Sequence, residues 1–219
     1  MSNSLFTNAQ WLKAERDVAA LRVEFPDASD ARLMRQLLKE GCLRAGAVGA
    51  GSTAIGLIPG LGKMLGWAVN FAGDAALTAA VQRDLLLRIF ALFGKKPTED
   101  DTAQISAWLA TVGVGGITVL EQVGGGIVKS LGKRILGRVI SRGLPVAEIV
   151  AASATHVVGT YLLARKAEAY CQGFTITTAR IDELDRRKMR NWTMLSVATV
   201  VNEESPKTVK EALTPEDDR

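Results

Sequence analysis

The amino-acid sequence predicts an all-α fold, a multi-helix bundle with Gly/Ala-rich helical hairpins and no sheet. Apolar and charged residues recur with the 3.6-residue period of a helix along much of the chain. No segment combines two-residue alternation with hairpin turn signals, so no strand pair is expected. Glycine supplies 21 of the 219 residues, whereas aromatic residues make up only 5%. Small residues let helix backbones approach closely, as in membrane helices, although a glycine-tolerant soluble core is the alternative.

The N-terminal segment predicts two amphipathic helices. Between residues 9 and 24 apolar side chains interleave with charged ones. Pro26 ends this helix, because the residue before a proline disfavours helical geometry. Ser29 or Asp30 can cap the next helix, which we expect to begin near Ala31.

The first charge-free run covers residues 45–62 and reads AGAVGAGSTAIGLIPGLG. Its 18 residues approach the length that spans a bilayer core, but Pro59 and the nearby glycines should interrupt a single span. We therefore expect two helices that meet at the IPGLG turn, or a re-entrant or interfacial hairpin over residues 45–66. Trp67 follows this hairpin directly and is a candidate membrane-interface anchor.

A second Gly/Ala-rich hairpin is expected over residues 103–126. The apolar helix before it should stop at Gly94, and acidic residues at positions 99–101 favour the N-terminus of the next helix through the helix dipole. Residues 102–120 form a charge-free run of 19 residues. This run contains Trp108, the second candidate interface anchor.

Residues 127–143 predict a basic amphipathic helix with one apolar stripe. No acidic residue balances its positive charges, and anionic bilayers attract such helices by roughly 1 kcal/mol per basic residue near the surface. An ordinary bundle helix with a solvated basic face is the alternative. The candidate lipid-binding cations are Lys129, Lys133, Arg134, Arg138 and Arg142.

The C-terminal third contains another charge-free run, residues 149–164, which includes His156, the single histidine of the chain. A long helix is expected from Phe174 to about Val201. Its charge-dense part, residues 180–190, could recruit a protein partner, as could the acidic tail. The tail itself has the composition of a disordered segment.

These patterns divide the chain into four parts. They are the N-terminal amphipathic helices (1–40), a helical core (41–173), a C-terminal charged helix (174–202) and a disordered tail (203–219).

The charge distribution favours an anionic partner. Residues 203–219 carry six acidic and three basic groups, so the remaining 202 residues have a net charge of +7. Lipid headgroups are preferred to nucleic acid, because the chain offers neither aromatic platforms nor a nucleic-acid-binding motif. Cys42 and Cys171 stand alone, which fits a reducing compartment better than a disulfide framework or zinc site. The first residues lack a secretory-signal pattern, so a cytosolic location is expected.

Motifs for cofactor or catalytic chemistry are weak. Gly49-x-Gly51-x-x-Ala54 matches a dinucleotide-binding loop superficially, but a helix rather than a strand is expected before it, which favours a close-packed helix pair. A core or interface role suits the single His156 better than a catalytic one. No catalytic, cofactor-binding or metal-binding residue is therefore assigned, and the chain is expected not to be an enzyme.

Polar residues inside apolar runs need either a partner or solvent. Asp74 could pair with Lys63 or Arg83. The alternative is that the carboxylates within apolar runs, Asp74, Glu121 and Glu148, face solvent. The buried-polar candidates are Asn70, Asp74, Glu148 and His156.

From about Lys39 to Gln172 the sequence resembles the EcsC family of bacterial proteins. It is similar, more distantly, to membrane-associated helical domains attached to some bacterial GTPases. The resemblance lies in the IPGLG string, in Asp74–Gly94 with its Gln82, and in Pro145 followed by a small-residue helix through Tyr170. It implies a helical bundle associated with membrane or transport systems, with a transport or GTPase partner, and it supplies no catalytic residues.

Three functions remain open at this point. The leading hypothesis is a cytosol-facing protein, peripheral or partly inserted at the inner membrane, that binds anionic lipid and can oligomerise. A soluble helical interaction module is the second hypothesis, and a regulated pore-former is the third.

Overall fold

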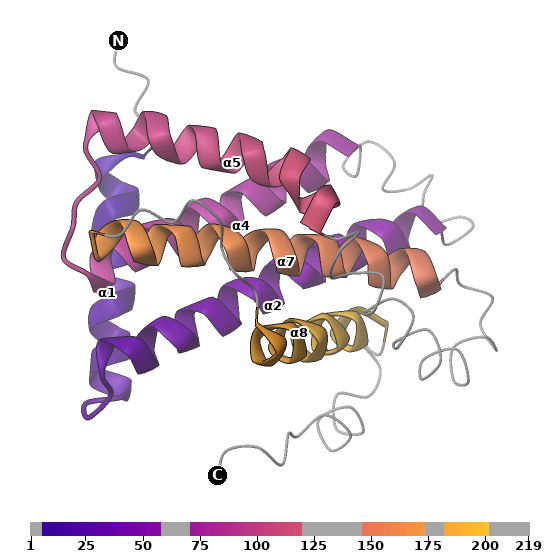
Figure 1. Cartoon of the computed structure of the whole chain (residues 1–219), viewed down its shortest axis with the longest axis horizontal. Helices are drawn as coiled ribbons and strands as arrows, with labels where there is room; N and C mark the ends of the chain where they lie inside the picture. The colour runs from indigo at the N-terminus through magenta and orange to yellow at the C-terminus, as the bar shows by residue number, and fades with distance from the viewer. Residues whose placement is uncertain (1–5, 58–70, 120–145, 174–181, 202–219) are drawn as a thin grey trace.

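The structure is a computed structural model that describes residues 6–57, 71–119, 146–173 and 182–201 (Figure 1). This part of the chain forms an all-α multi-helix bundle and contains no strand, as the sequence predicts. Several predictions concern residues outside these ranges. They are the assignments of Trp67 and Asn70, the basic helix over 127–143 and the tail from residue 203. The described helices are α1 (Asn8–Glu24), α2 (Asp30–Leu57), α4 (Phe71–Leu92), α5 (Glu99–Val119), α7 (Val146–Cys171) and α8 (Glu183–Val201).

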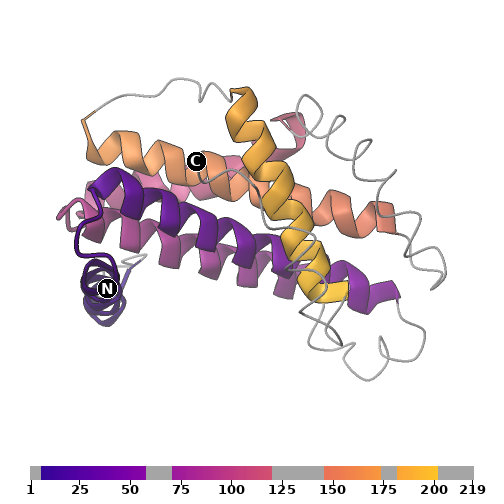
Figure 2. The ribbon, with the colours of Figure 1, turned by 90° about the horizontal axis from the view of Figure 1, so that it is seen from below.

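Helices α2, α4 and α7 form the centre of the bundle. Glu40 and Arg44 of α2 pair with α4 in antiparallel register, whereas Gln82 of α4 meets Thr160 of α7 in parallel register. Helix α1 packs across α4, α5 packs on α7, and α8 crosses α2 and α7 (Figure 2). Fully buried apolar side chains fill the spaces between these helices, among them Leu33, Met34, Leu86, Ile89, Phe90, Ile149, Val157, Val158, Leu163 and Met189.

The ends of the helices follow local capping chemistry. Thr7 and Gln10 form a reciprocal capping box at the start of α1. Ser29 accepts a hydrogen bond from the Arg32 amide at 3.4 Å, so Ser29 rather than Asp30 caps α2. Gly94 has φ +64°, a left-handed conformation that suits glycine, and it follows α4 as the sequence predicts.

Helix α2 joins two segments that the sequence pattern separates. It continues without a break from Asp30 to Leu57, so the division expected at residues 40 and 41 falls inside a helix. Gly49 and Gly51 both lie within α2, which excludes a strand-to-helix phosphate loop at that position. The sequence predicts a helix from Phe174 to about Val201. The structure describes its later part, which is α8 from Glu183 to Val201.

Glycines on α2 let the neighbouring helices approach its backbone. A Cβ atom on Gly41 would lie 2.5 Å from Leu85 of α4, and one on Gly49 would lie 2.9 Å from the Ala152 carbonyl oxygen of α7. On Gly46 it would meet both α7 and α8. The close-packed helix pair predicted around Gly49 is confirmed.

No helix within the described ranges combines the length and the apolar character that a membrane crossing requires.

Candidate functional site

The residues predicted to bind lipid fall mostly outside the described part of the chain, which includes Trp108 but not Trp67 or the five cations of 127–143. Trp108 is 6% exposed, and its indole meets the Tyr170 ring edge-on with the centroids 5.4 Å apart. Lys166 lies over the same indole, with Nζ 5.5 Å from its centroid. This burial corrects the assignment of Trp108 as an interface anchor, because the ring packs inside the bundle.

An ion-pair network joins α1, α2 and α4 at one end of the bundle. Its centre is Arg88, whose side chain is only 12% exposed. The guanidinium lies 3.2 Å from Asp17, 3.1 Å from Glu40 and 3.2 Å from Asp84. Burial opposes the charged form, but the three carboxylates outweigh it and raise the pKa of Arg88. One side chain thus ties three helices together.

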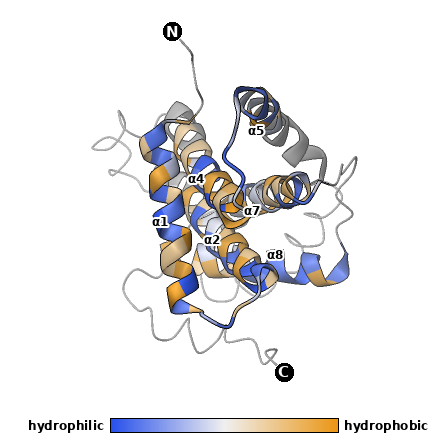
Figure 3. Cartoon of the chain, turned by 90° about the vertical axis from the view of Figure 1, so that its left-hand side faces the viewer, coloured by the Kyte–Doolittle hydropathy of each residue, from blue (hydrophilic) through white to orange (hydrophobic). Residues whose placement is uncertain are grey.

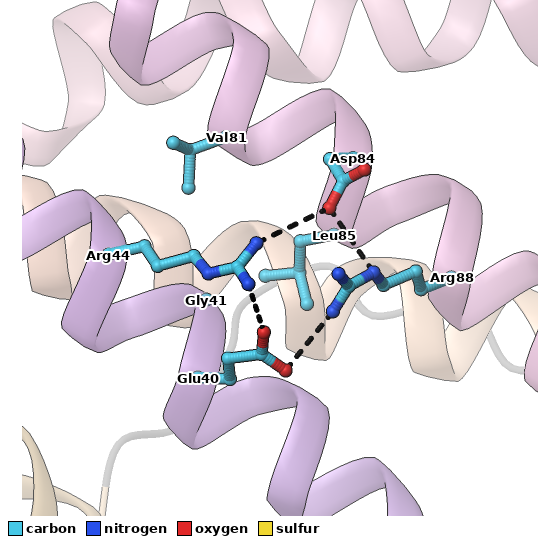
Figure 4. A pocket seen from close by; sticks show the side chains of 7 residues that line it. All are labelled: Glu40, Gly41, Arg44, Val81, Asp84, Leu85 and Arg88. Carbon is cyan, nitrogen blue, oxygen red and sulfur yellow. Dashed lines mark hydrogen bonds and ion pairs between the residues drawn. The ribbon is translucent and has the colours of Figure 1, made fainter. Parts of the chain in front are cut away.

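The rest of this network balances its charge. Lys13 binds Asp17 at 2.8 Å and Asp84 at 2.9 Å, and Arg44 binds Glu40 at 2.5 Å. Three cations therefore face three carboxylates. Four members of the network, Glu40, Arg44, Asp84 and Arg88, border a pocket (Figure 4). Its free space is about 10 Å³, room for one water molecule at most. Its lining residues are Glu40, Gly41, Arg44, Val81, Asp84, Leu85 and Arg88. This neutral, filled site is suited to holding helices together rather than to binding a ligand.

A polar seam runs between the parallel helices α4 and α7. Thr78 Oγ1 lies 2.8 Å from His156 Nδ1, and the Gln82 amide donates to Thr160 Oγ1 at 3.2 Å. His156 is half-buried and packs against Gly49 of α2. The candidate His156 is therefore a partnered group within the bundle. Asp74 and Glu148 belong to α4 and α7, but their side chains lie outside the described set.

A third cluster, which we call the α5–α7 knot, consists of Asp101 and Trp108 of α5, Tyr170 of α7, and Lys95 and Thr98 of the preceding turn. Asp101 is 3% exposed and accepts hydrogen bonds from the Tyr170 hydroxyl and from the Thr98 amide and hydroxyl. Lys95 Nζ lies 3.9 Å from the Tyr170 ring centroid. The knot fixes the N-terminal end of α5 to the C-terminal end of α7.

The α5–α7 knot also shifts the pKa values of Asp101 and Tyr170. Burial of Asp101 is outweighed by its hydrogen bonds from Tyr170 and Thr98, so the pKa of this carboxyl is lowered. The hydrogen bond to Asp101, with burial, raises the pKa of Tyr170 to about 12. A raised pKa stabilises the fold below the ordinary tyrosine value near 10, and this contribution is lost as the pH rises toward about 12. For Asp101 the contribution is present above pH 3.8 and is lost as the pH falls through its lowered pKa.

The sequence patterns do not mark Arg88, Asp101 or Tyr170 as site residues. The i,i+4 spacing of Asp84 and Arg88 and the capping spacing of Thr98 and Asp101 are visible locally. Their decisive partners lie about 70 positions away, Asp17 for Arg88 and Tyr170 for Asp101. Spacing within one helix cannot reveal such pairs.

Charge is distributed unevenly along the bundle. The C-terminal ends of α2 and α5 and the N-terminal ends of α4 and α7 lie together at one end (Figure 1). Among the described residues of these four helix ends, the sequence contains no lysine or arginine and two carboxylates, Asp74 and Glu148. We call this the charge-poor end; it comprises residues 45–57, 71–82, 110–119 and 146–160. The ion-pair network and the α5–α7 knot lie toward the opposite end.

No protein-family model, curated protein or solved structure matches this chain. Among the described side chains, no three His, Cys, Asp or Glu residues gather as a metal site would require.

Proposed function

We propose that this chain is a non-catalytic, cytosol-facing protein that binds anionic membranes, peripherally or partly inserted, through the charge-poor end of its bundle. The observation that supports this proposal best is the uneven distribution of charge along the four long helices, α2, α4, α5 and α7. The described residues of this end include no lysine or arginine and two carboxylates, so these helix ends lose little hydration free energy when they meet a lipid interface. The charged opposite end favours water.

The sequence between the described helices adds attraction for anionic lipid. The chain leaves α5 at Val119 and enters α7 at Val146, both at the charge-poor end. The intervening residues include the five cations of 127–143. At roughly 1 kcal/mol for each basic residue near an anionic surface, they supply several kcal/mol of binding free energy. The resemblance of residues 39–172 to the EcsC family agrees with this proposal, and membership in that family stays a prediction.

Sedimentation with vesicles tests the proposal. The unmodified protein should sediment with vesicles of equal parts phosphatidylglycerol and phosphatidylcholine at low salt, and much less with phosphatidylcholine alone. The K129Q/K133Q/R134Q/R138Q/R142Q variant should lose at least tenfold in affinity, because about 1.4 kcal/mol corresponds to each factor of ten.

A matched variant removes five cations elsewhere. Arg16, Arg32, Arg35, Lys39 and Arg83 are exposed on α1, α2 and α4. The R16Q/R32Q/R35Q/K39Q/R83Q variant has the same net charge as the first variant and should keep most of the affinity. Equal losses in the two variants would mean that overall charge, not the charge-poor end, governs binding.

Burial of the apolar runs favours a second candidate, a soluble helical module that binds a protein. In α7 the run 149–164 buries Ile149, Ala154 and Val158 completely. Helix α8 meanwhile presents Leu184, which is 57% exposed, beside the exposed Arg186 and Arg187. Stable monodispersity without detergent, together with no sedimentation on either vesicle type, would favour this candidate.

A further inference from the structure

The second half of α5 has a sequence that disfavours its own helix. Residues 110–119 read ATVGVGGITV, and nine of the ten are either glycine or β-branched. Glycine loses the most backbone entropy in a helix, and β-branched side chains lose rotamer freedom there. Local propensity alone therefore does not hold this half in helical form.

The packing that is available to α5 is limited. Its one extensive helix neighbour in the described part of the chain is α7, whereas α2, α4 and α7 each pack against at least three helices. Seen end-on, α5 lies on the outside of the bundle, beyond α7 (Figure 3). The most peripheral of the long helices is thus also the one whose second half has the weakest helix propensity.

The two halves of α5 differ in what can hold them. Asp101 and Trp108, in the first half, belong to the α5–α7 knot. Residues 110–119 contain no ionisable and no aromatic side chain, so they can form neither an ion pair nor an aromatic contact. The knot therefore acts on one end of the helix only.

We propose that residues 110–119 form a conditional helix, which opens from α7 in water and exchanges α7 for lipid at the membrane, while the knot keeps the first half attached. Lipid is the contact partner that suits the sequence of residues 110–119 best. In a low-dielectric environment the backbone must satisfy its own hydrogen bonds, which stabilises a helix whatever its propensity in water. Glycine is frequent in membrane helices, and an uncharged segment avoids the cost of burying charge. The choice of lipid rests on the proposed function, whereas the opening in water does not.

Hydrogen exchange of the full chain without lipid tests the opening. The amides of residues 110–119 should exchange at least tenfold faster than those of 102–109 and 157–167. The T111A/T118A variant, which replaces two β-branched residues by alanine, should slow exchange about fivefold within 110–119 and nowhere else. Exchange in 110–119 as slow as in 157–167 would overturn the conditional helix, whatever the protein does with lipid.

The knot has its own matched pair of variants. Y170F removes the hydroxyl that binds Asp101, and exchange in residues 102–119 should accelerate about tenfold, because hydrogen bonds to charged groups are among the stronger ones. The hydroxyl of Tyr161, the other tyrosine of α7, donates a hydrogen bond to Asp185 of α8. Y161F should leave exchange in α5 unchanged. Equal acceleration of α5 in the two variants would refute a local role for the knot.

Hydrogen exchange in the presence of vesicles then tests whether lipid replaces α7 as the contact partner of residues 110–119. On vesicles of equal parts phosphatidylglycerol and phosphatidylcholine, exchange in 110–119 should slow at least tenfold, with little change in α1. If the protein sediments with these vesicles but 110–119 stays unprotected, the inference is wrong and the proposed function stands. If the protein does not sediment, lipid is excluded as the contact partner and the proposed function fails with it.

Discussion

Replacing Arg88 by methionine is expected to lower the free energy of unfolding by about 3 kcal/mol. Methionine keeps most of the buried volume, but it leaves Asp17, Glu40 and Asp84 without their shared central cation. The remaining cations of the network, Lys13 and Arg44, are about half exposed, so solvent screens what they contribute. Urea unfolding followed by circular dichroism measures the change.

Arg83 provides the control on the same helix. It is exposed, and R83M should therefore change the free energy of unfolding by no more than about 0.5 kcal/mol. The R88M loss should also persist at high salt, because buried ion pairs are screened much less than exposed ones. A loss below about 1 kcal/mol for R88M would show that the network does not hold α1, α2 and α4 together.

The second large effect is expected at Gly46, where α2 touches two helices at once. A Cβ atom there would lie 2.5 Å from Ser196 Oγ and 2.7 Å from Val157 Cγ2. Both neighbours belong to packed helices and cannot move independently, so G46A should destabilise the fold by about 2 kcal/mol despite the better helix propensity of alanine.

Gly51, five residues further along α2, is the matched control. A Cβ atom added at Gly51 would meet nothing within 4 Å. G51A should therefore stabilise the protein by up to about 1 kcal/mol through helix propensity alone. Thermal or urea unfolding of the two variants should give shifts of opposite sign. G46A at least as stable as G51A would mean that the close contact of α2 with α7 and α8 is not required.

Most of the helices could be predicted because their signals are local. Pro26, Gly94 and the acids at 99–101 mark helix ends through backbone geometry and the helix dipole, which depend on a few neighbouring residues. The unbroken course of α2 could not be predicted in the same way. Its glycine-rich half is helical because α7 and α8 pack against Gly46 and Gly49, and this contact overrides weak local propensity.

The candidate site was less predictable than the fold. Trp108 and Tyr170 are 62 positions apart in the chain, and nothing in either local sequence indicates that their rings meet. Burial reverses the role expected of Trp108, because an amphipathic ring suits a bundle interior as well as a membrane interface. The uneven charge along the bundle depends on the fold, because antiparallel helices bring charge-free runs that are separate in the sequence to the same end.

The most direct test of the membrane proposal compares the two ends of α7 on anionic vesicles. A polarity-sensitive fluorophore is attached at V146C, at the charge-poor end, or at Q172C, just past the other end of the helix, in a C171S background. Cys42 is fully buried and burial raises the pKa of its thiol, so it does not compete for the label. A blue shift on vesicle binding is expected at position 146 and none at position 172. A shift at position 172 alone, or at neither position in protein that sediments with the vesicles, would contradict the membrane proposal.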